Sequence, residues 1–177
     1  MYRYTSLAVV AAVALGFSAA VSSSGMAADL AKSGTFEGRF YSHSVQKIED
    51  LETADGMKSY ISESFTFHEG NQHGGFFDGT TERCVAFGRY SDSSGAVKEV
   101  GRCTPIDADG DKIFEEYVVE MSGPKDTNPG KAQLLGGTGK YKGLTGNITF
   151  TLETWPPISK TETMAAGNYK GEYKIGE

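Results

Sequence analysis

The chain has 177 residues and a formal net charge of −6, a balance that argues against nucleic acid and anionic membrane surfaces as partners. Glycine is abundant, with 23 residues, while there are 5 prolines and 2 cysteines. Ten phenylalanines and nine tyrosines supply aromatic surface for a core. Internal repeats, low-complexity segments and basic runs interleaved with aromatics are all absent from the sequence after residue 27.

The first 27 residues are typical of a secretory signal peptide. Arg3 gives a weakly positive start, Leu7–Val21 is apolar and rich in alanine, and small residues follow up to Ala28. This apolar run is too short for a transmembrane helix. We expect cleavage near Ala27 or Ala28, and a secreted or periplasmic protein with one domain at 28–177.

The rest of the chain reads as strands separated by turns rich in Gly, Pro, Asn, Asp and Ser, without a 3.6-residue period. Strands at this spacing without helices predict an all-β fold. Closure of eight strands removes the sheet edges, which favours an eight-stranded antiparallel up-and-down β-barrel. The expected strands are Thr35–His43, Ser59–His68, Thr80–Ser91, Ala96–Ile106, Lys112–Met121, Lys131–Leu135, Leu144–Trp155 and Met164–Ile175.

The two cysteines test the register of one hairpin. Asp92-Ser93-Ser94-Gly95 is a turn signal, and strands paired about it bring Cys84 opposite Cys103. An even number of cysteines in an exported chain favours a disulfide. We therefore predict a structural Cys84–Cys103 bond.

Lys131–Trp155 combines a short apolar run, a glycine-dense turn and a long alternating strand. The turn fails as a phosphate-binding loop, because Tyr141 follows Gly139-Lys140 where a P-loop needs Ser or Thr, and Lys142 stands where a dinucleotide fingerprint needs glycine. Both motifs also require a helix next, and a strand is expected here. A reversal between two strands is the better interpretation.

The turn GGTGKYKGLTG, set between a short apolar strand and an alternating one, resembles the hallmark turn of the allene oxide cyclase/dirigent-type barrels and of small secreted bacterial proteins of that type. The resemblance covers about residues 131–152. It implies an eight-stranded antiparallel barrel with a central apolar cavity, often in a homotrimer. The catalytic positions of the plant enzymes find no match in this chain, so the resemblance carries over no isomerase activity.

The apolar faces of the expected strands provide candidates for the barrel interior. Glu63 and Glu115 lie in phase with such faces and would enter the cavity if those faces point inward. The other interpretation places both at a rim or on the solvent face, because charged groups are rarely buried without partners. With these two, the candidate cavity residues are Phe36, Phe40, Ile61, Phe65, Phe67, Phe87, Tyr117, Ile148, Phe150 and Leu152.

Two clusters of polar residues invite a metal hypothesis that we do not favour. The Asp107–Asp111 segment lacks EF-hand spacing and suits a hairpin turn. In an up-and-down barrel this turn shares an end with His68 and His73, but no spacing among them is diagnostic of a metal site. No GxSxG, HExxH or CxxC pattern occurs, so we expect no catalytic constellation, metal or cofactor.

Three functions remain open. The favoured one is an exported, non-enzymatic barrel that binds a small apolar molecule. A cavity-free structural or interaction barrel is the second. The third is an allene oxide cyclase-like isomerase acting on a lipid-derived substrate, which would require Glu63 or Glu115 inside the cavity.

Overall fold

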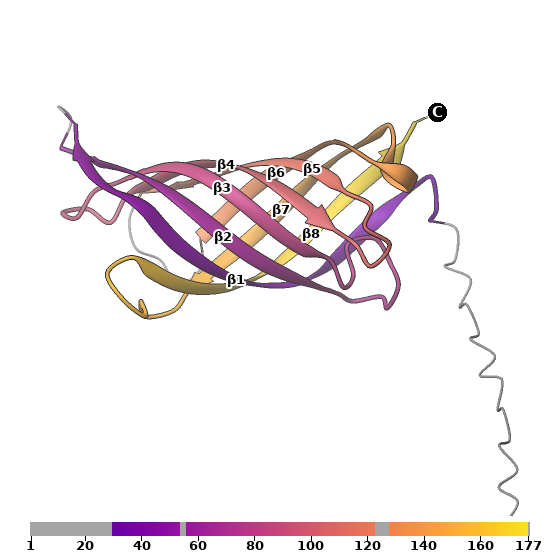
Figure 1. Ribbon diagram of the computed structural model, residues 1–177, viewed down its shortest axis with the longest axis horizontal. Helices are drawn as coiled ribbons and strands as arrows, with labels where there is room; N and C mark the ends of the chain where they lie inside the picture. The colour runs from indigo at the N-terminus through magenta and orange to yellow at the C-terminus, as the bar shows by residue number, and fades with distance from the viewer. Residues whose placement is uncertain (1–29, 54–55, 123–127, 177) are drawn as a thin grey trace, which may run out of the picture.

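Eight strands follow one another along the chain and close into an antiparallel barrel, in which the last strand pairs with the first (Figure 1). The computed structural model describes residues 30–53, 56–122 and 128–176, so the predicted signal peptide at 1–27 lies outside the described residues. The closed antiparallel barrel confirms the predicted all-β fold class. The strands are β1 (Ser33–Glu52), β2 (Lys58–Gly70), β3 (Thr81–Tyr90), β4 (Val97–Ile106), β5 (Ile113–Met121), β6 (Asn128–Gly137), β7 (Leu144–Thr154) and β8 (Glu162–Ile175).

The predicted hairpin register is also confirmed. Cys84 on β3 pairs with Cys103 on β4, and the two sulfurs are bonded at 2.06 Å. Both cysteines are buried and their side chains point into the barrel. The bond therefore joins adjacent strands from the inside, and it is consistent with an oxidising environment.

Four strands are longer than the sequence predicted, β1 and β6 by the most residues, and β2 and β8 by two or three. β1 continues beyond His43 to Glu52, because it keeps pairing with β2 through two register irregularities. β6 begins at Asn128, although Pro129 and Gly130 are typical of a turn. Gly130 is required there by packing: a Cβ on this residue would lie 2.1 Å from the ring of Phe150 on β7.

The glycine-dense turn between β6 and β7 reverses the chain as predicted. It contains one turn of 3₁₀ helix, η1 (Gly139–Tyr141), flanked by glycines with positive φ. Gly143 has φ 73°, a conformation that other residues rarely adopt. The turn brings Tyr141 into the core.

Glycines and aromatic rings face each other inside the barrel. The same relation recurs at several cross-strand pairs: the glycine has no side chain, and the ring of its partner lies over it. Because a barrel of this size has limited interior volume, the missing Cβ atoms provide space for the rings. The pairs are Gly34–Tyr173, Phe36–Gly171, Gly38–Tyr169, Phe40–Gly167, Tyr60–Gly88, Gly101–Tyr117 and Gly130–Phe150.

The hydrophobic core fills one end of the barrel, which we call the packed end. The β2–β3 loop folds Phe76 and Phe77 into this end, where the Phe76 ring stacks on Tyr173 with centroids 4.1 Å apart. Phe36, Tyr141 and Leu144 complete the plug. The packed end lies near the C-terminus and η1 in Figure 1. The opposite half of the barrel, toward the β3–β4 and β7–β8 turns, is the hollow end.

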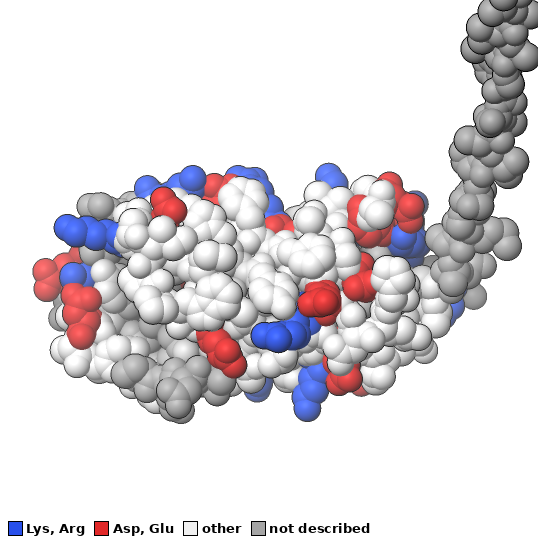
Figure 2. Space-filling view, turned by 90° about the horizontal axis from the view of Figure 1, so that it is seen from below, with Lys and Arg blue, Asp and Glu red and all other residues white. Residues whose placement is uncertain are grey.

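The outer surface of the barrel is partly apolar. Seen from below Figure 1, it presents a broad uncharged area broken by small groups of charged side chains (Figure 2). Outward residues across β2–β5 pair in one row, Ile61 with Phe87, Phe87 with Val100 and Val100 with Val118. About half of the Phe87 and Val100 side chains is exposed, at 52% and 49%.

Candidate functional site

A cavity of about 430 Å³ occupies the hollow end and the middle of the barrel. This volume is within the range of small-molecule sites. Its walls differ in character from one side to the other. One wall is formed by apolar side chains from β1, β5 and β7: Phe40, Val119, Ile148, Phe150 and Leu152. Another wall is formed by hydroxyl groups from β1 and β2: Ser42, Ser44, Ser62, Ser64 and Thr66.

Half of the sequence-predicted cavity residues line this space. They come from β1, β5 and β7: Phe40, Glu115, Tyr117, Ile148, Phe150 and Leu152. Phe36 also points inward, but it is packed between Phe76, Phe77 and Tyr173 in the plug.

The prediction was wrong for the five candidates on β2 and β3: Ile61, Glu63, Phe65, Phe67 and Phe87. All of them point outward, and Phe65 and Phe67 are 50% and 47% exposed. The error came from assuming that the apolar face of each strand is the inner face. On β2 the serines and threonine face the cavity, because Ser64 pairs with the inward Cys84 and alternation then fixes the whole strand.

Glu63 is held by ion pairs on the outer face. Its carboxylate accepts from Arg83 Nε at 2.5 Å and lies 3.1 Å from Lys47 Nζ. These cations hold the pKa of Glu63 below its ordinary value. Glu63 therefore acts as a surface link between β1, β2 and β3 and has no access to the cavity.

Glu99 on β4 binds two tyrosines inside the cavity, a site that the sequence analysis missed. The hydroxyl of Tyr60 donates to Glu99 Oε2 at 2.5 Å, and that of Tyr117 donates to Oε1 at 2.6 Å. Burial and the adjacent Glu99 charge raise the pKa of both phenols, which keeps them protonated as donors. Register provides the missing signal, because Glu99 lies four residues before the inward Cys103 on the same strand.

Glu82 and Glu115 are two further carboxyl groups in the cavity, on β3 and β5. Both residues are 8% exposed, and neither Glu82 Oε2 nor Glu115 Oε2 has a hydrogen-bond partner among the described residues. They flank the disulfide: Glu115 pairs with Cys103, and Glu82 Oε1 lies 3.0 Å from Cys84 Sγ. A disulfide sulfur has no proton to donate, so this contact is not a hydrogen bond. The Thr66 hydroxyl donates to the Glu82 carboxyl group, and Oε2 is the oxygen that lacks a partner.

Burial raises the pKa of both groups. Desolvation is the largest cause for each, and the proximity of Glu115 raises the pKa of Glu82 further. Burial next to each other therefore favours the protonated forms of both carboxyl groups. This pair is the most electrostatically unusual feature of the cavity.

His68 lies where the cavity meets the plug. Its ring packs edge-on against Phe77 and Tyr169, and Nδ1 is 3.1 Å from Thr80 Oγ1. Burial lowers the pKa of His68 to about 4, so the ring is neutral at physiological pH. Its Nε2 is 4.0 Å from Glu82 Oε2, which is too far for a hydrogen bond. Because the imidazole ring is neutral, it also provides no positive charge to the Glu82 carboxyl group.

The His and Asp residues in the loops of the packed end form ion pairs within the protein and do not form a metal site among the described residues. Lys140 Nζ lies 2.6 Å from Asp107 and 2.6 Å from Asp109, so an ammonium group of the protein itself binds these carboxylates. His73 pairs with Asp78 at 3.1 Å. Among the described residues, three potential ligand residues converge only at Glu82, Cys84 and Cys103, where the disulfide occupies both sulfurs.

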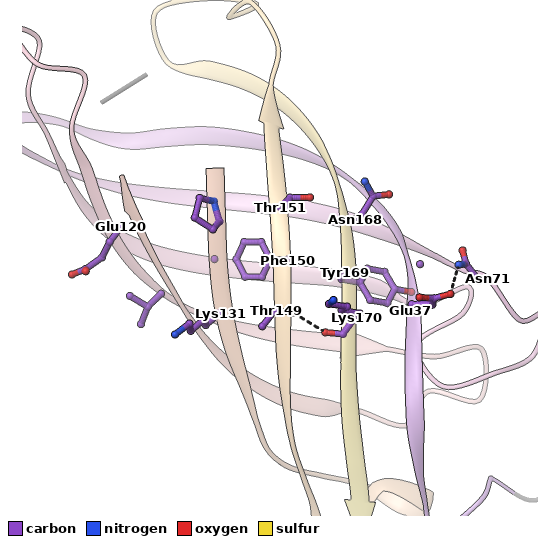
Figure 3. A pocket seen from close by; sticks show the side chains of 14 residues that line it. Glu37, Asn71, Glu120, Lys131, Thr149, Phe150, Thr151, Asn168, Tyr169 and Lys170 are labelled. Atoms are coloured by element: carbon purple, nitrogen blue, oxygen red, sulfur yellow. Dashed lines mark hydrogen bonds between the residues drawn. The ribbon is translucent and has the colours of Figure 1, made fainter. Parts of the chain in front are cut away.

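A shallow groove lies on the outside, over β5–β8 and the start of β1 (Figure 3). Outward polar side chains such as Lys131, Thr149 and Lys170 form its surface. At one edge Asn71 donates to Glu37 at 3.0 Å. Among the described residues that line this groove, only Tyr169 has a buried polar side-chain atom without a partner, and Tyr169 also lines the inner cavity. The inner cavity is therefore the better candidate site.

Comparisons with known proteins support the fold. No family model matches the sequence, and no curated protein matches it significantly. A protein of unknown function from the DUF3224 family of Shewanella oneidensis MR-1 shares the barrel, with a TM-score of 0.55 and 12% identity over 82% of this chain and 99% of that one. A pterocarpan synthase dirigent protein aligns with a TM-score of 0.49 and 12% identity, covering 83% of this chain and 89% of its own. At such identities the likeness extends to the fold alone.

Proposed function

We propose that this protein is an exported, non-enzymatic binding protein that holds one small molecule in the cavity at the hollow end. The observation that carries the proposal is a 430 Å³ space inside a barrel whose opposite end is plugged by aromatic rings. A barrel with a purely structural role would fill its interior with side chains along its whole length. The buried disulfide agrees with function in an oxidising compartment outside the cytoplasm.

The polar wall of the cavity changes the class of ligand that we expect, which from the sequence was a small apolar molecule. An entirely apolar molecule would leave the inward serines and carboxyl groups of β2–β5 without partners. A molecule with an apolar body and polar groups on one side fits both walls. The rings and aliphatic chains of Phe40, Phe150 and Leu152 would contact the body, and the opposite wall would supply hydrogen bonds.

Filling the cavity tests the proposal. The fluorescent probe N-phenyl-1-naphthylamine should bind the wild-type protein, whereas Ser62→Phe, which adds a ring inside the cavity, should weaken binding at least tenfold. Thr149→Phe adds the same ring on the exposed outer face and is the matched control. Circular dichroism of each variant verifies the barrel. Equal binding by wild type and a folded Ser62→Phe variant would contradict the proposal.

One observation favours a second function, the isomerase. Glu115 lies inside the cavity with a raised pKa, and a carboxyl group in that state can give or take a proton. A fatty-acid allene oxide generated in the presence of the protein would then close to one predominant enantiomer. Chiral chromatography measures this excess, which Glu115→Gln should abolish. A racemic product with the wild-type protein would remove this alternative.

A further inference from the structure

The charges that line the cavity are strongly unbalanced. Glu82, Glu99 and Glu115 enter it from the adjacent strands β3, β4 and β5. Besides these, the described lining residues contribute His68, which is neutral, and the tyrosines Tyr60, Tyr90, Tyr117 and Tyr169. Lys160 is the one lysine or arginine among the described lining residues, and it is exposed in the β7–β8 turn.

The three carboxyl groups are not equivalent. Glu99 receives hydrogen bonds from two tyrosines, so its charge is already compensated. Glu82 and Glu115 are equally deep, yet each keeps an oxygen atom without a donor. Buried polar atoms are paired in nearly all native structures, and an exception calls for an explanation such as a missing ligand.

Aromatic rings line the same cavity as this pair. The rings of Phe40 and Phe150 are edge-to-face at 6.1 Å between centroids, and Tyr117 lies 6.3 Å from Phe150. Aromatic faces attract cations and also provide flat apolar contact for a ligand body. Buried carboxyl groups that each keep one unpartnered oxygen, in one cavity with aromatic rings, form an environment suited to an organic cation.

We infer that the cavity binds an organic ammonium ion, with its N–H groups donating to Glu82 and Glu115 and its apolar body against Phe40, Phe150 and Leu152. This inference rests on the proposed binding function and specifies its ligand class. The ammonium group supplies the donors that both orphan oxygens lack. Its positive charge also stabilises the ionised form of a carboxyl pair that otherwise retains protons, which a neutral donor such as an alcohol does not do.

Three isosteric probes separate charge from shape. Isothermal titration calorimetry at pH 7.5 with 1-naphthylmethylamine, 1-naphthalenemethanol and 1-naphthoate should show the ammonium binding at least tenfold more tightly than the alcohol. The carboxylate should bind weakest, because it enters a cavity that already contains three acidic groups. A carboxylate that binds as tightly as the amine would overturn the inference.

Variants of the two carboxyl residues test whether they cause the preference for the ammonium probe. Glu82→Gln and Glu115→Gln should each lower the amine affinity at least tenfold and leave the affinity for the alcohol within twofold. Both variants replace a buried carboxyl group by a neutral amide of similar size and are expected to fold. Glu116→Gln is the matched control, since Glu116 points outward and pairs with Arg102 at 3.1 Å. Unchanged amine affinity in both cavity variants would overturn the inference.

The outcomes distinguish this inference from the proposed function. If all three probes bind the wild-type protein equally and Ser62→Phe abolishes their binding, the cavity is a ligand site without preference for cations. If none of the probes binds, nor N-phenyl-1-naphthylamine, then the binding function itself fails.

Discussion

At the scale of single residues, the buried carboxyl pair determines how stability depends on pH. The folded state raises the pKa of Glu115 above its unfolded value, so the folded protein retains this proton more strongly than the unfolded chain. The resulting stability is fully present below the unfolded pKa of about 4.5 and is lost as pH rises toward about 8. The same sign applies to Glu82.

Replacing Glu115 by Gln should therefore flatten the alkaline side of the stability profile. Urea unfolding at pH 5 and pH 8.5 should show wild type losing stability, on the order of 1–3 kcal/mol, across this interval, and the variant losing less. Glu116→Gln, on the outer face, should retain the wild-type loss. A Glu115→Gln profile parallel to wild type would show that this carboxyl group ionises freely in the folded protein.

His68 gives the opposite dependence. Burial lowers the pKa of His68 from 6.5 to about 4, so the folded state resists protonation that the unfolded chain accepts. Stability from this group is present above pH 6.5 and decreases as pH falls toward 4. NMR should find the His68 ring, assigned by its loss in His68→Leu, neutral down to about pH 4. Titration near pH 6.5 would contradict its burial against Phe77 and Tyr169.

At the scale of elements, the disulfide connects two strands that already pair. The bonded cysteines are 19 residues apart in sequence, and closing a loop of this size stabilises by about 3 kcal/mol on the chain-entropy model. The Cys84→Ala/Cys103→Ala double variant should lose up to this amount in urea unfolding. Reductant should then destabilise wild type and leave the double variant unchanged. Equal stability of the two oxidised proteins would mean that the β3–β4 hairpin gains nothing from the bond.

The glycine opposite Tyr117 preserves the cavity wall. A Cβ on Gly101 would lie 2.3 Å from the Tyr117 ring, so Gly101→Ala must displace a ring that is hydrogen-bonded to Glu99. Overpacking of this kind destabilises by about 1–3 kcal/mol, and the shifted ring should also weaken probe binding. Adding Tyr117→Leu should recover part of the stability lost to the clash. No change in melting temperature for Gly101→Ala would contradict this packing.

These elements show which features a single sequence could predict. The Cys84–Cys103 register followed from one turn signal, because pairing about a turn is set by counting residues. The inward face of β2 did not follow, because its outer face carries Phe65 and Phe67 while Ser62 and Ser64 face the cavity. Where both the inside and the outside carry apolar groups, hydrophobic alternation no longer identifies the inner face. The inward position of Cys84 and the β2–β3 register, both provided by the structure, identify the inner face of β2.

At the scale of the whole molecule, the barrel has two different outer surfaces. Over β6–β8 it is polar, with Lys131, Thr149 and Lys170 along the groove of Figure 3. Over β2–β5 half-exposed apolar side chains form the row from Ile61 through Phe87 and Val100 to Val118. Contiguous apolar surface of this kind is typical of a protein–protein contact and is seldom left open to solvent.

A second copy of this chain is the partner that we expect on the apolar surface, in the trimer that the turn between β6 and β7 implies by resemblance. Light scattering after gel filtration should give the mass of three protomers for the purified protein. The double variant Phe87→Lys/Val100→Lys places two charges in the middle of the row. Because these side chains are 52% and 49% exposed and lie outside the barrel core, the variant should fold and be monomeric. Thr149→Lys, on the polar surface, should remain assembled. Wild-type protein that is monomeric at tens of micromolar would contradict this prediction.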